Sequence, residues 1–267
     1  MQSKELIAVV AVAVIAVLAC TFIVDNKSDD TERIGIIGAM DTEVSTIKEE
    51  MDIERIETIA NMDFCIGTLG GKDIVVAQCG MGKVNAGICA QIMIMQYNAT
   101  AIINTGVAGS LDYSLNIGDY IVSVDAVQHD FDATPIGYGQ GEIPYTGQSS
   151  FKADEGLRTL AMWAIAECSD AAAYEARICT GDQFISGDDQ KLDIVQRYGG
   201  KCCEMEGGAV AQACYLGDVP FVIIRAISDK ADEEIPDFEE FSKKIAMQCA
   251  AIVGYMIVHF DDVHIRS

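Results

Sequence analysis

The stretch PFVIIRAIS, residues 220–228, decides the fold class of this chain. Apart from Arg225 and Ser228 it is an apolar run with no alternation of polar and apolar positions. Such runs are typical of strands that are buried on both faces, and those strands occur in parallel sheets covered by helices. We therefore expect this stretch to lie inside a sheet with helices on either side.

Five more β-rich runs occur along the chain, at residues 33–39, 73–80, 100–109, 119–127 and 174–182. Helical patterns alternate with them, at residues 83–97, 154–168, 188–198, 207–216 and 237–258. This alternation predicts an α/β fold, in which residues 33–267 form a single domain with a central twisted, mixed, mostly parallel β-sheet flanked by helices. In such sheets ligands bind beyond the carboxyl ends of the strands.

The composition restricts the kinds of partner and site. The chain has 267 residues, half of them apolar, and a formal net charge of −23. A protein that binds nucleic acid needs a basic face, so we expect no nucleic-acid partner. The acidity fits either an ordinary solvated surface or adaptation to high salt. The ten cysteines include no C-x-x-C pair and the three histidines are scattered, so the sequence indicates neither a metal site nor a cofactor.

The first 32 residues differ from the rest. LIAVVAVAVIAVLACTFIV, residues 6–24, carries no charge and is followed by a polar linker at 25–32. Its length suits a membrane span and also the core of a signal peptide. VLAC resembles a bacterial lipoprotein cleavage box with Cys20 as the acylated residue. We expect residues 1–24 to be a signal peptide, a lipoprotein signal or a membrane anchor, with the following domain outside the cytoplasm.

Two glycine-rich stretches follow predicted strands. CGMGKVNAG, residues 79–87, is not a P-loop, because Ala77 and Val84 stand where that motif needs glycine and serine or threonine. It is either a tight turn or a loop whose amides approach a ligand. In NTGVAGS, residues 104–110, Gly106 and Gly109 let another group come close to the backbone.

Several carboxylates lie near predicted strand ends. In KCCEMEGGAV, residues 201–210, Glu204 and Glu206 flank a methionine, and strand alternation would put both on one face. Burying two carboxylates together is costly unless they are used. Asp229 follows an apolar strand with Ser228 beside it, so it is either a general acid or a turn residue. Glu43 in GAMDTEV has the same two interpretations.

In chain order these stretches read GIIGAMxxEV, GxGKVxA, INTGxAG, GDQFI, EMEGGAVA and RAISDKAD. Together they resemble the 5′-methylthioadenosine/S-adenosylhomocysteine nucleosidases of the purine nucleoside phosphorylase and uridine phosphorylase superfamily, over about residues 33–258. The resemblance implies an enzyme that hydrolyses the N-glycosidic bond of these two substrates. Adenine and the 5′-thioribose product would leave, no cofactor would be needed, and the enzyme would be a homodimer.

The resemblance also implies roles for four catalytic residues. Asp229 would protonate adenine N7, with Ser228 positioning its carboxyl group. Glu43 would hold and deprotonate the attacking water, helped by Arg225. An ion pair between Glu43 and Arg225 is expected as well.

Further residues would bind the substrate. Glu206 would accept hydrogen bonds from the ribose hydroxyls, with Glu204 behind it and Met205 against the sugar. Phe184 would stack on adenine, and the backbone of Ile185 would read the edge of the base.

The 5′ end of the substrate would lie among apolar residues. Met81 and Phe238 would line this part of the pocket, and Ile136 and Pro144 of a neighbouring subunit would close it. Ile136 replaces an aromatic residue of the family, and the loop before Phe238 is one residue short. The remaining candidates are Val107, Ala108 and Gly109, and Val107 stands where a serine that contacts the water is often found.

Two other functions stay open on the sequence alone. One is a phosphate-dependent purine nucleoside phosphorylase, which would need basic residues to hold phosphate. The other is a surface-anchored nucleoside-binding protein without turnover. The physiological substrate also stays open, since aminofutalosine and 5′-deoxyadenosine share the adenine nucleoside.

Overall fold

The computed structural model describes residues 31–231 and 238–265, with the backbone alone for 238–244 and 246. Residues Glu32–Ser267 form one compact unit. The predicted signal or anchor segment, residues 1–24, lies outside the described residues, as does nearly all of the linker 25–32. Within the described ranges, no helix has both the length and the apolar character that a membrane span requires.

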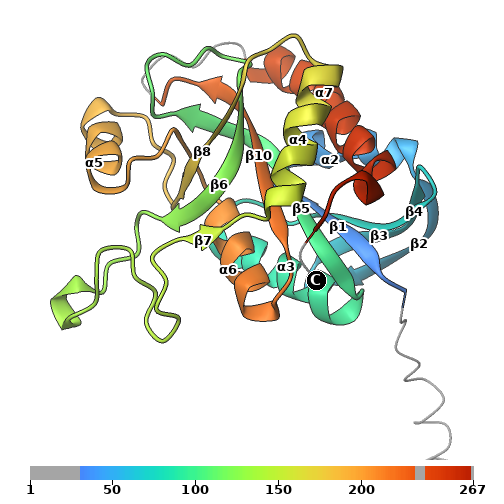
Figure 1. The fold of residues 1–267 in the computed structure, drawn as a ribbon, viewed down its shortest axis with the longest axis horizontal. Coiled ribbons are helices and arrows are strands. Elements are labelled where there is room, and N and C mark those ends of the chain that lie inside the picture. Colours follow the sequence, from blue (N-terminus) through green and yellow to red (C-terminus); the bar gives the residue numbers. More distant parts are fainter. Residues whose placement is uncertain (1–30, 232–237, 266–267) are drawn as a thin grey trace, which may run out of the picture. The chain divides into compact units, whose positions relative to one another are not determined.

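The strands of the described residues form one mixed sheet (Figure 1). They are β1 (Arg33–Gly38), β2 (Asp52–Ile59), β3 (Met62–Leu69), β4 (Lys72–Gln78), β5 (Ala99–Ser110), β6 (Tyr120–Gln128), β7 (Phe151–Lys152), β8 (Ala173–Thr180), β9 (Cys202–Glu204) and β10 (Phe221–Asp229). The helices are α2 (Asp41–Glu50), α3 (Lys83–Gln96), α4 (Glu155–Cys168), α5 (Asp188–Tyr198), α6 (Gly207–Gly217) and α7 (Phe238–Val258), with short 3-10 turns η1 (Thr134–Ile136) and η2 (Phe260–Asp262). All predicted strands and helices are present, with ends within two residues of those predicted.

The prediction of a single α/β domain with a mixed sheet is confirmed. The strand order is β10-β6-β8-β9-β5-β1-β4-β3-β2, and β10 also pairs with β5, so five strands close into a ring. Five of the ten described pairings are parallel and five antiparallel. Parallel pairing thus predominates only among the strands that were predicted from the sequence.

The antiparallel part is a meander of β2, β3 and β4, of which only β4 was predicted. The turn between β2 and β3 uses Ala60 and Asn61, both with positive φ. Two consecutive residues of that conformation make the tight turn that fits a twisted hairpin, but alanine is an unusual residue there. The missing glycine signal explains why this hairpin was not predicted.

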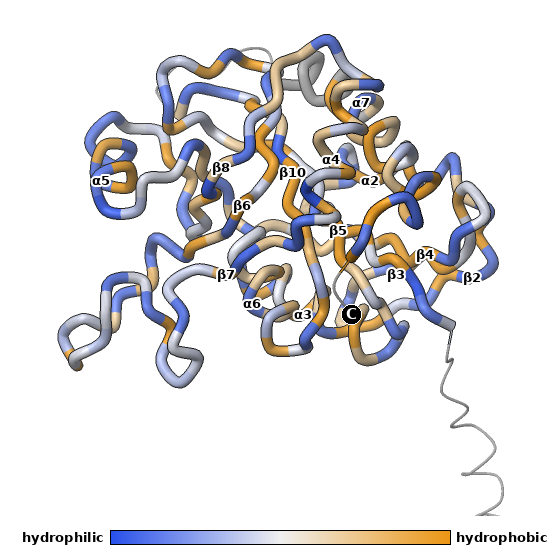
Figure 2. Tube along the Cα trace, viewed as in Figure 1, coloured by the Kyte–Doolittle hydropathy of each residue, from blue (hydrophilic) through white to orange (hydrophobic). Residues whose placement is uncertain are grey.

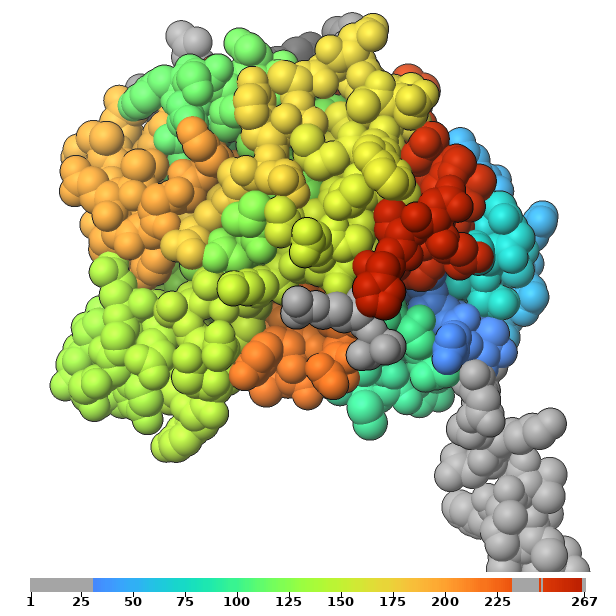
Figure 3. Space-filling view, viewed as in Figure 1, coloured from blue at the N-terminus to red at the C-terminus, as the bar shows by residue number. Residues whose placement is uncertain are grey.

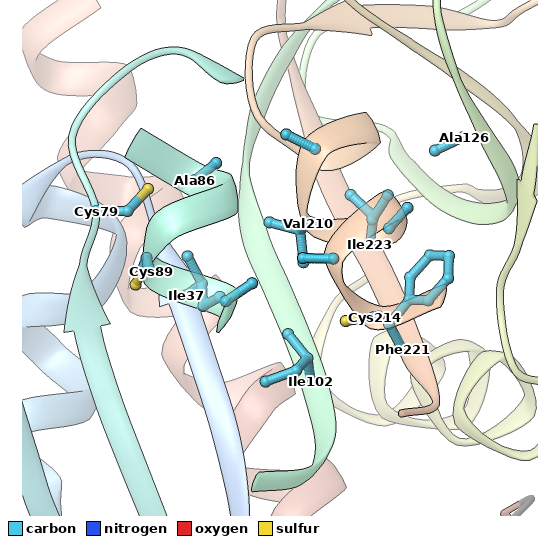
Figure 4. Close-up of a cluster of buried hydrophobic side chains, with 14 of the residues drawn as sticks. Ile37, Cys79, Ala86, Cys89, Ile102, Ala126, Val210, Cys214, Phe221 and Ile223 are labelled. Atoms are coloured by element: carbon cyan, nitrogen blue, oxygen red, sulfur yellow. The ribbon is translucent and has the colours of Figure 1, made fainter. Parts of the chain in front are cut away.

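The two faces of the sheet carry separate hydrophobic clusters. On β1, β5 and β10, neighbouring residues such as Ile36 and Ile37 belong to different clusters, so these strands are buried on both faces. Helices α3 and α6 cover one face, and α2, α4 and α7 cover the other. Figure 4 shows Cys89 of α3 and Val210 of α6 beside Ile37 and Ile102 of the sheet. The apolar trace in Figure 2 follows these central strands.

Candidate active site

A cavity lies beyond the carboxyl ends of β1, β5, β8, β9 and β10. Its lining consists of Ala39, Met40, Glu43, Met81, Val107, Ala108, Gly109, Gln183, Phe184, Ile185, Cys203, Glu204, Met205, Glu206, Ser228 and Asp229. Most of the predicted site residues are therefore in one place. Three of them are not in this lining, Arg225, Ile136 and Pro144, and the side chain of Phe238 lies outside the described residues.

Asp229 is the last residue of β10 and its carboxyl group is held on both sides. Ser228 Oγ donates to Oδ2 at 2.7 Å, and the backbone N–H of Ala231 donates to Oδ1 at 2.8 Å. The side chain is buried, yet it lines the cavity. A carboxyl group fixed in this way can still form a hydrogen bond with a ligand. Because the side chain is already held, little conformational freedom is lost on binding.

Glu43 lies in the first turn of α2, directly after β1. Its Oε2 accepts the backbone N–H groups of Ala39 at 2.6 Å and Met40 at 2.9 Å, and its Oε1 accepts that of Val107 at 3.2 Å. Burial raises the pKa of this carboxyl group, against the charge of Arg225 and these backbone donors. The side chain thus caps its own helix and joins α2 to β5.

Two glycines of β5 make room for these carboxylates, as the sequence suggested. A β-carbon at Gly106 would lie 2.6 Å from Glu43 Oε1 and 3.4 Å from Arg225 Nη1. One at Gly109 would lie 2.9 Å from Asp229 Oδ1. Since 2.6 Å and 2.9 Å are too short for a methyl group, glycine at both positions lets a catalytic candidate approach the strand.

The expected ion pair between Arg225 and Glu43 is not the one that forms. Arg225 Nη2 bonds Glu204 Oε2 at 2.5 Å and Asn104 Oδ1 at 2.6 Å, and the guanidinium is buried. Arg225 bonds Glu204 because β9, which carries Glu204, pairs with β5, and this pairing could not be predicted from the local pattern. The charge of Arg225 still acts on Glu43, but its hydrogen bonds hold other groups.

Glu204 and Glu206 do not share a strand face, in contrast to the sequence-based expectation. Strand β9 ends at Glu204, and Glu206 is the residue that precedes α6. Glu204 accepts from Thr180 Oγ1, Arg225 and the backbone N–H groups of Glu206 and Gly207. Its carboxylate is therefore occupied by protein groups although it also lines the cavity, and its place behind Glu206 stays a prediction.

Glu206 has a different environment. Its Oε1 accepts the backbone N–H of Gly82 at 2.9 Å, directly before α3. Burial raises the pKa of this carboxyl group to about 7, with a further contribution from Glu204 and opposition from Arg225. The carboxyl group of Glu206 therefore lines the cavity with a pKa near neutral pH, and it can accept further hydrogen bonds from a ligand.

We expect the Glu206→Gln variant to be more stable than the wild type at pH 8 but not at pH 4. Because burial raises the pKa in the folded state from 4.5 to about 7, the folded protein keeps a proton that the unfolded chain has lost. From pH 4 to pH 8 the free energy of unfolding of the wild type should fall by on the order of 1–3 kcal/mol, and the glutamine variant should not show this fall.

Urea denaturation at both pH values measures this difference. Glu167→Gln, which replaces an exposed glutamate of α4, is the control and should show no pH-dependent gain. An equal effect of Glu206→Gln at pH 4 and pH 8 would contradict the assignment.

The mouth of the cavity is apolar and open in the single chain. Met81 is 65% exposed and Phe184 is 62% exposed, whereas Ile185 is buried. The predicted residues Ile136 and Pro144 lie in the segment between β6 and β7 and do not reach their own chain's cavity. This is compatible with their predicted place in the pocket of a neighbouring subunit, which stays a prediction.

Some lining residues were not predicted. Ala39 and Met40 connect β1 to α2, Gln183 follows β8, and Cys203 lies on β9. Asn104, which holds Arg225, could have been found as an amide inside an apolar strand. All cysteines within the described ranges are free thiols.

Three comparisons relate the chain to known proteins. It matches the Phosphorylase superfamily over residues 33–257. The 5′-methylthioadenosine/S-adenosylhomocysteine nucleosidase of Shewanella sediminis is 41% identical over 83% of this chain and 96% of its own length, and that of Shewanella pealeana is 40% identical over the same shares.

Solved structures of related enzymes are also similar to this chain over most of its length. The nucleosidase of Neisseria meningitidis in complex with methylthio-immucillin-A has a TM-score of 0.80 at 34% identity, over 86% of this chain and 99% of that one. Futalosine hydrolase of Helicobacter pylori has a TM-score of 0.79 at 32% identity, over 85% and 97%. With its ring of strands and its cavity of carboxylates, this chain belongs to the Phosphorylase superfamily and, within it, to the 5′-methylthioadenosine/S-adenosylhomocysteine nucleosidases.

Proposed function

We propose that this protein hydrolyses the N-glycosidic bond of 5′-methylthioadenosine and S-adenosylhomocysteine, which yields adenine and the corresponding 5′-thioribose. The observation that carries the proposal is a single cavity whose lining includes the carboxyl side chains of Glu43, Glu206 and Asp229, with Glu204 as a fourth, beside the exposed ring of Phe184. The relatives named above support it, and a nucleosidase of Colwellia psychrerythraea was solved in complex with adenine.

The chemistry follows from the separate environments of these carboxyl groups. Asp229 gives a proton to adenine N7, so that the electrons of the C1′–N9 bond can leave with a neutral base. The ribose becomes cationic, and water adds to C1′ while Glu43 takes the proton that the water loses. Glu206 holds the ribose hydroxyls and, when ionised, stabilises the positive charge.

The rest of the cavity suits the two ends of such a nucleoside. The ring of Phe184 offers a stacking surface for the base, and the backbone of Ile185 can bond to its edge. Met40, Met81 and Val107 make an apolar wall that suits a 5′-thioether. Among its described residues, the lining contains no lysine or arginine.

The same feature argues against a phosphorylase. Arg225 is occupied by Glu204 and Asn104, and Lys83 bonds Asp130. An ionised Glu43 beside the position of the nucleophile would repel a phosphate dianion, at a cost on the order of several kcal/mol in a desolvated cleft. Water carries no such penalty.

We expect adenine release from methylthioadenosine in phosphate-free buffer, with methylthioribose as the second product. Added phosphate should leave the rate unchanged, because the described part of the lining contains no lysine or arginine to bind it. Chromatography of both products measures this. A sugar 1-phosphate, formed only when phosphate is present, would assign the protein to the phosphorylases, and binding without adenine release would leave a nucleoside-binding protein. Futalosine-type nucleosides and 5′-deoxyadenosine belong in the same assay.

The active form is proposed to be a homodimer. Met81, Val84 and Ile88 are exposed apolar residues on or just before α3, with Leu216 of α6 also exposed, and together they form what we call the α3 surface. Their spacing places Val84 and Ile88 on one face of α3, and Met81 precedes this helix. Since Met81 also lines the cavity, a second subunit on this surface would cover the mouth. Residues 134–150, light green in Figure 3, project beside α6 and could supply Ile136 and Pro144.

We expect the Ile88→Glu variant to become a monomer with a raised KM, since a buried charge in the α3 surface disfavours association and leaves the mouth open. Light scattering at the assay concentration, together with kinetics, measures both effects. Met247→Glu on α7, where Met247 is 63% exposed, is the control and should stay dimeric. A monomeric wild type with full activity would contradict the dimer.

The localisation is a separate part of the proposal. An uncharged segment of 19 residues, 6–24, precedes a polar linker, and this pattern supports export or membrane anchoring of the enzymatic domain. Comparing the full chain with one that starts at Thr31 in membrane fractions tests it. A Cys20→Ser variant labelled with a lipid precursor separates lipidation from a simple span.

A further inference from the structure

A junction outside the cavity connects three segments of the chain. Asp130 Oδ1 accepts Lys83 Nζ at 2.6 Å, and Asp130 Oδ2 accepts the backbone N–H of Asp182 at 2.8 Å. Asp182 Oδ1 in turn accepts the backbone N–H of Lys83 at 2.8 Å. We call Lys83, Asp130 and Asp182 the Asp130 junction. None of the three lines the cavity described above.

The sheet brings these residues together. Strands β6 and β8 are parallel, with Gln128 opposite Thr180, so the residues that follow both strands lie at one edge. The backbone N–H of His129 bonds the carbonyl of Thr180 at 2.9 Å and continues this register to the start of the junction. Asp130 thereby faces both the segment after β8 and the first turn of α3.

Two of the three segments at the junction lead directly to a substrate-binding candidate. Asp182 is two residues before Phe184, which lines the base side of the cavity. Lys83 is the residue after Gly82, whose N–H bonds Glu206 Oε1 at 2.9 Å. Gly82 has φ +100°, and a β-carbon there would lie 3.2 Å from Asp182 Oδ1. Two carboxylates, Asp182 and Glu206, therefore share the first N–H groups of α3.

The position of the N-terminus of α3 affects the pKa and the orientation of the Glu206 carboxyl group. The N-terminus of this 14-residue helix carries partial positive charge and unpaired N–H groups. The hydrogen bond from Gly82 lowers the pKa of Glu206 against the effect of burial. If the first turn of α3 moves away, Glu206 loses the hydrogen bond from Gly82, which both orients its carboxylate and stabilises its ionised form.

We propose that Asp130 is a positioning residue for the reaction: it fixes the first turn of α3 against the segment after β8, so that Glu206 is oriented for the ribose hydroxyls while Phe184 is set for the base. This inference rests on the proposed nucleosidase function. Asp130 acts through Lys83, Asp182 and Gly82 and does not touch the substrate.

The test compares Asp130→Asn with a matched control, Asp125→Asn. Asp125 lies on β6, the strand that Asp130 follows. It pairs with Arg177 on β8 through two hydrogen bonds, and none of them involves α3. For each protein, kcat/KM is measured on methylthioadenosine and on its analogue without the 3′-hydroxyl. The ratio of the two values reports how well Glu206 uses that hydroxyl.

We expect Asp130→Asn to raise KM for methylthioadenosine about tenfold with a smaller change in kcat, and to reduce the discrimination against the deoxy analogue about tenfold. The acidic limb of its kcat/KM profile should move to higher pH. Asp125→Asn should keep the discrimination of the wild type, even where both variants lose thermal stability. An unchanged ratio and an unchanged limb in folded Asp130→Asn would overturn the proposal.

Two further measurements keep the proposal testable. Lys83→Met removes one bond of the junction and should shift the ratio in the same direction by a smaller factor. Amide hydrogen exchange without substrate should increase at residues 82–86 and 183–187 in Asp130→Asn but not in Asp125→Asn. Failure of the wild type to release adenine would overturn the proposed function and with it the role of Asp130 in the reaction, whereas unchanged exchange in Asp130→Asn would overturn the junction and leave the function standing.

Discussion

Replacing Asp229 by asparagine is expected to lower kcat by at least about a hundredfold, the usual loss when a general acid is removed. The asparagine side chain has nearly the same shape, and its oxygen can still accept one of the two hydrogen bonds, from Ser228 Oγ or from Ala231 N–H. What it cannot do is release a proton to adenine N7. The fold should therefore survive while the leaving group stays unprotonated.

Single-turnover release of adenine measures this effect without interference from product dissociation. Asp119→Asn is the matched control, because Asp119 is also a buried aspartate that accepts backbone and amide N–H groups, yet it lies outside the cavity. Its kcat should stay close to that of the wild type. A folded Asp229→Asn protein with nearly normal turnover would remove Asp229 from the mechanism.

The fold could be predicted from the sequence where burial dictates residue type. The runs around Ile36, Ile102 and Ile223 have apolar residues at consecutive positions, because helices cover both faces of their strands. Strand β2 gave no comparable signal, since it is exposed along much of its length and its turn contains Ala60 where glycine or asparagine is usual. Local pattern fails where a strand is stabilised mainly by its neighbours.

The site could be predicted less completely, for a related reason. The position of Asp229 follows from the end of its strand, and the need for Gly106 follows from the approach of Glu43. The partner of Arg225 does not follow from any local pattern, because Glu204 reaches it only through the pairing of β9 with β5. The Asp130 junction was missed in the same way, since its members are far apart in the chain.

Replacing Glu43 by glutamine is expected to lower kcat about a thousandfold, because the change removes the base and also disturbs the residues around it. Both oxygens of Glu43 accept backbone N–H groups, from Ala39 and Met40 on one side and Val107 on the other. The amide nitrogen of glutamine cannot accept a hydrogen bond, so at least one of these donors loses its partner.

Two effects on stability oppose each other in this variant. A buried donor without a partner costs about 1–3 kcal/mol. Against this, burial raises the pKa of Glu43, so that the ionised form is disfavoured in the folded protein, and a neutral glutamine removes that disadvantage at pH values above the raised pKa. We therefore expect the stability of Glu43→Gln to stay close to that of the wild type at neutral pH and to fall below it in acid.

The pH profile separates a base from a merely structural residue. If ionised Glu43 takes the proton of the water, kcat in the wild type should fall as the pH drops through a value above the ordinary 4.5, since burial raises this pKa. The residual activity of Glu43→Gln should lack that limb. Gly106→Ala, which would crowd the same carboxylate, should lose activity but keep a pH-dependent limb, because the ionisable group remains. A folded Glu43→Gln enzyme within tenfold of the wild type, with the same acidic limb, would mean that another group activates the water.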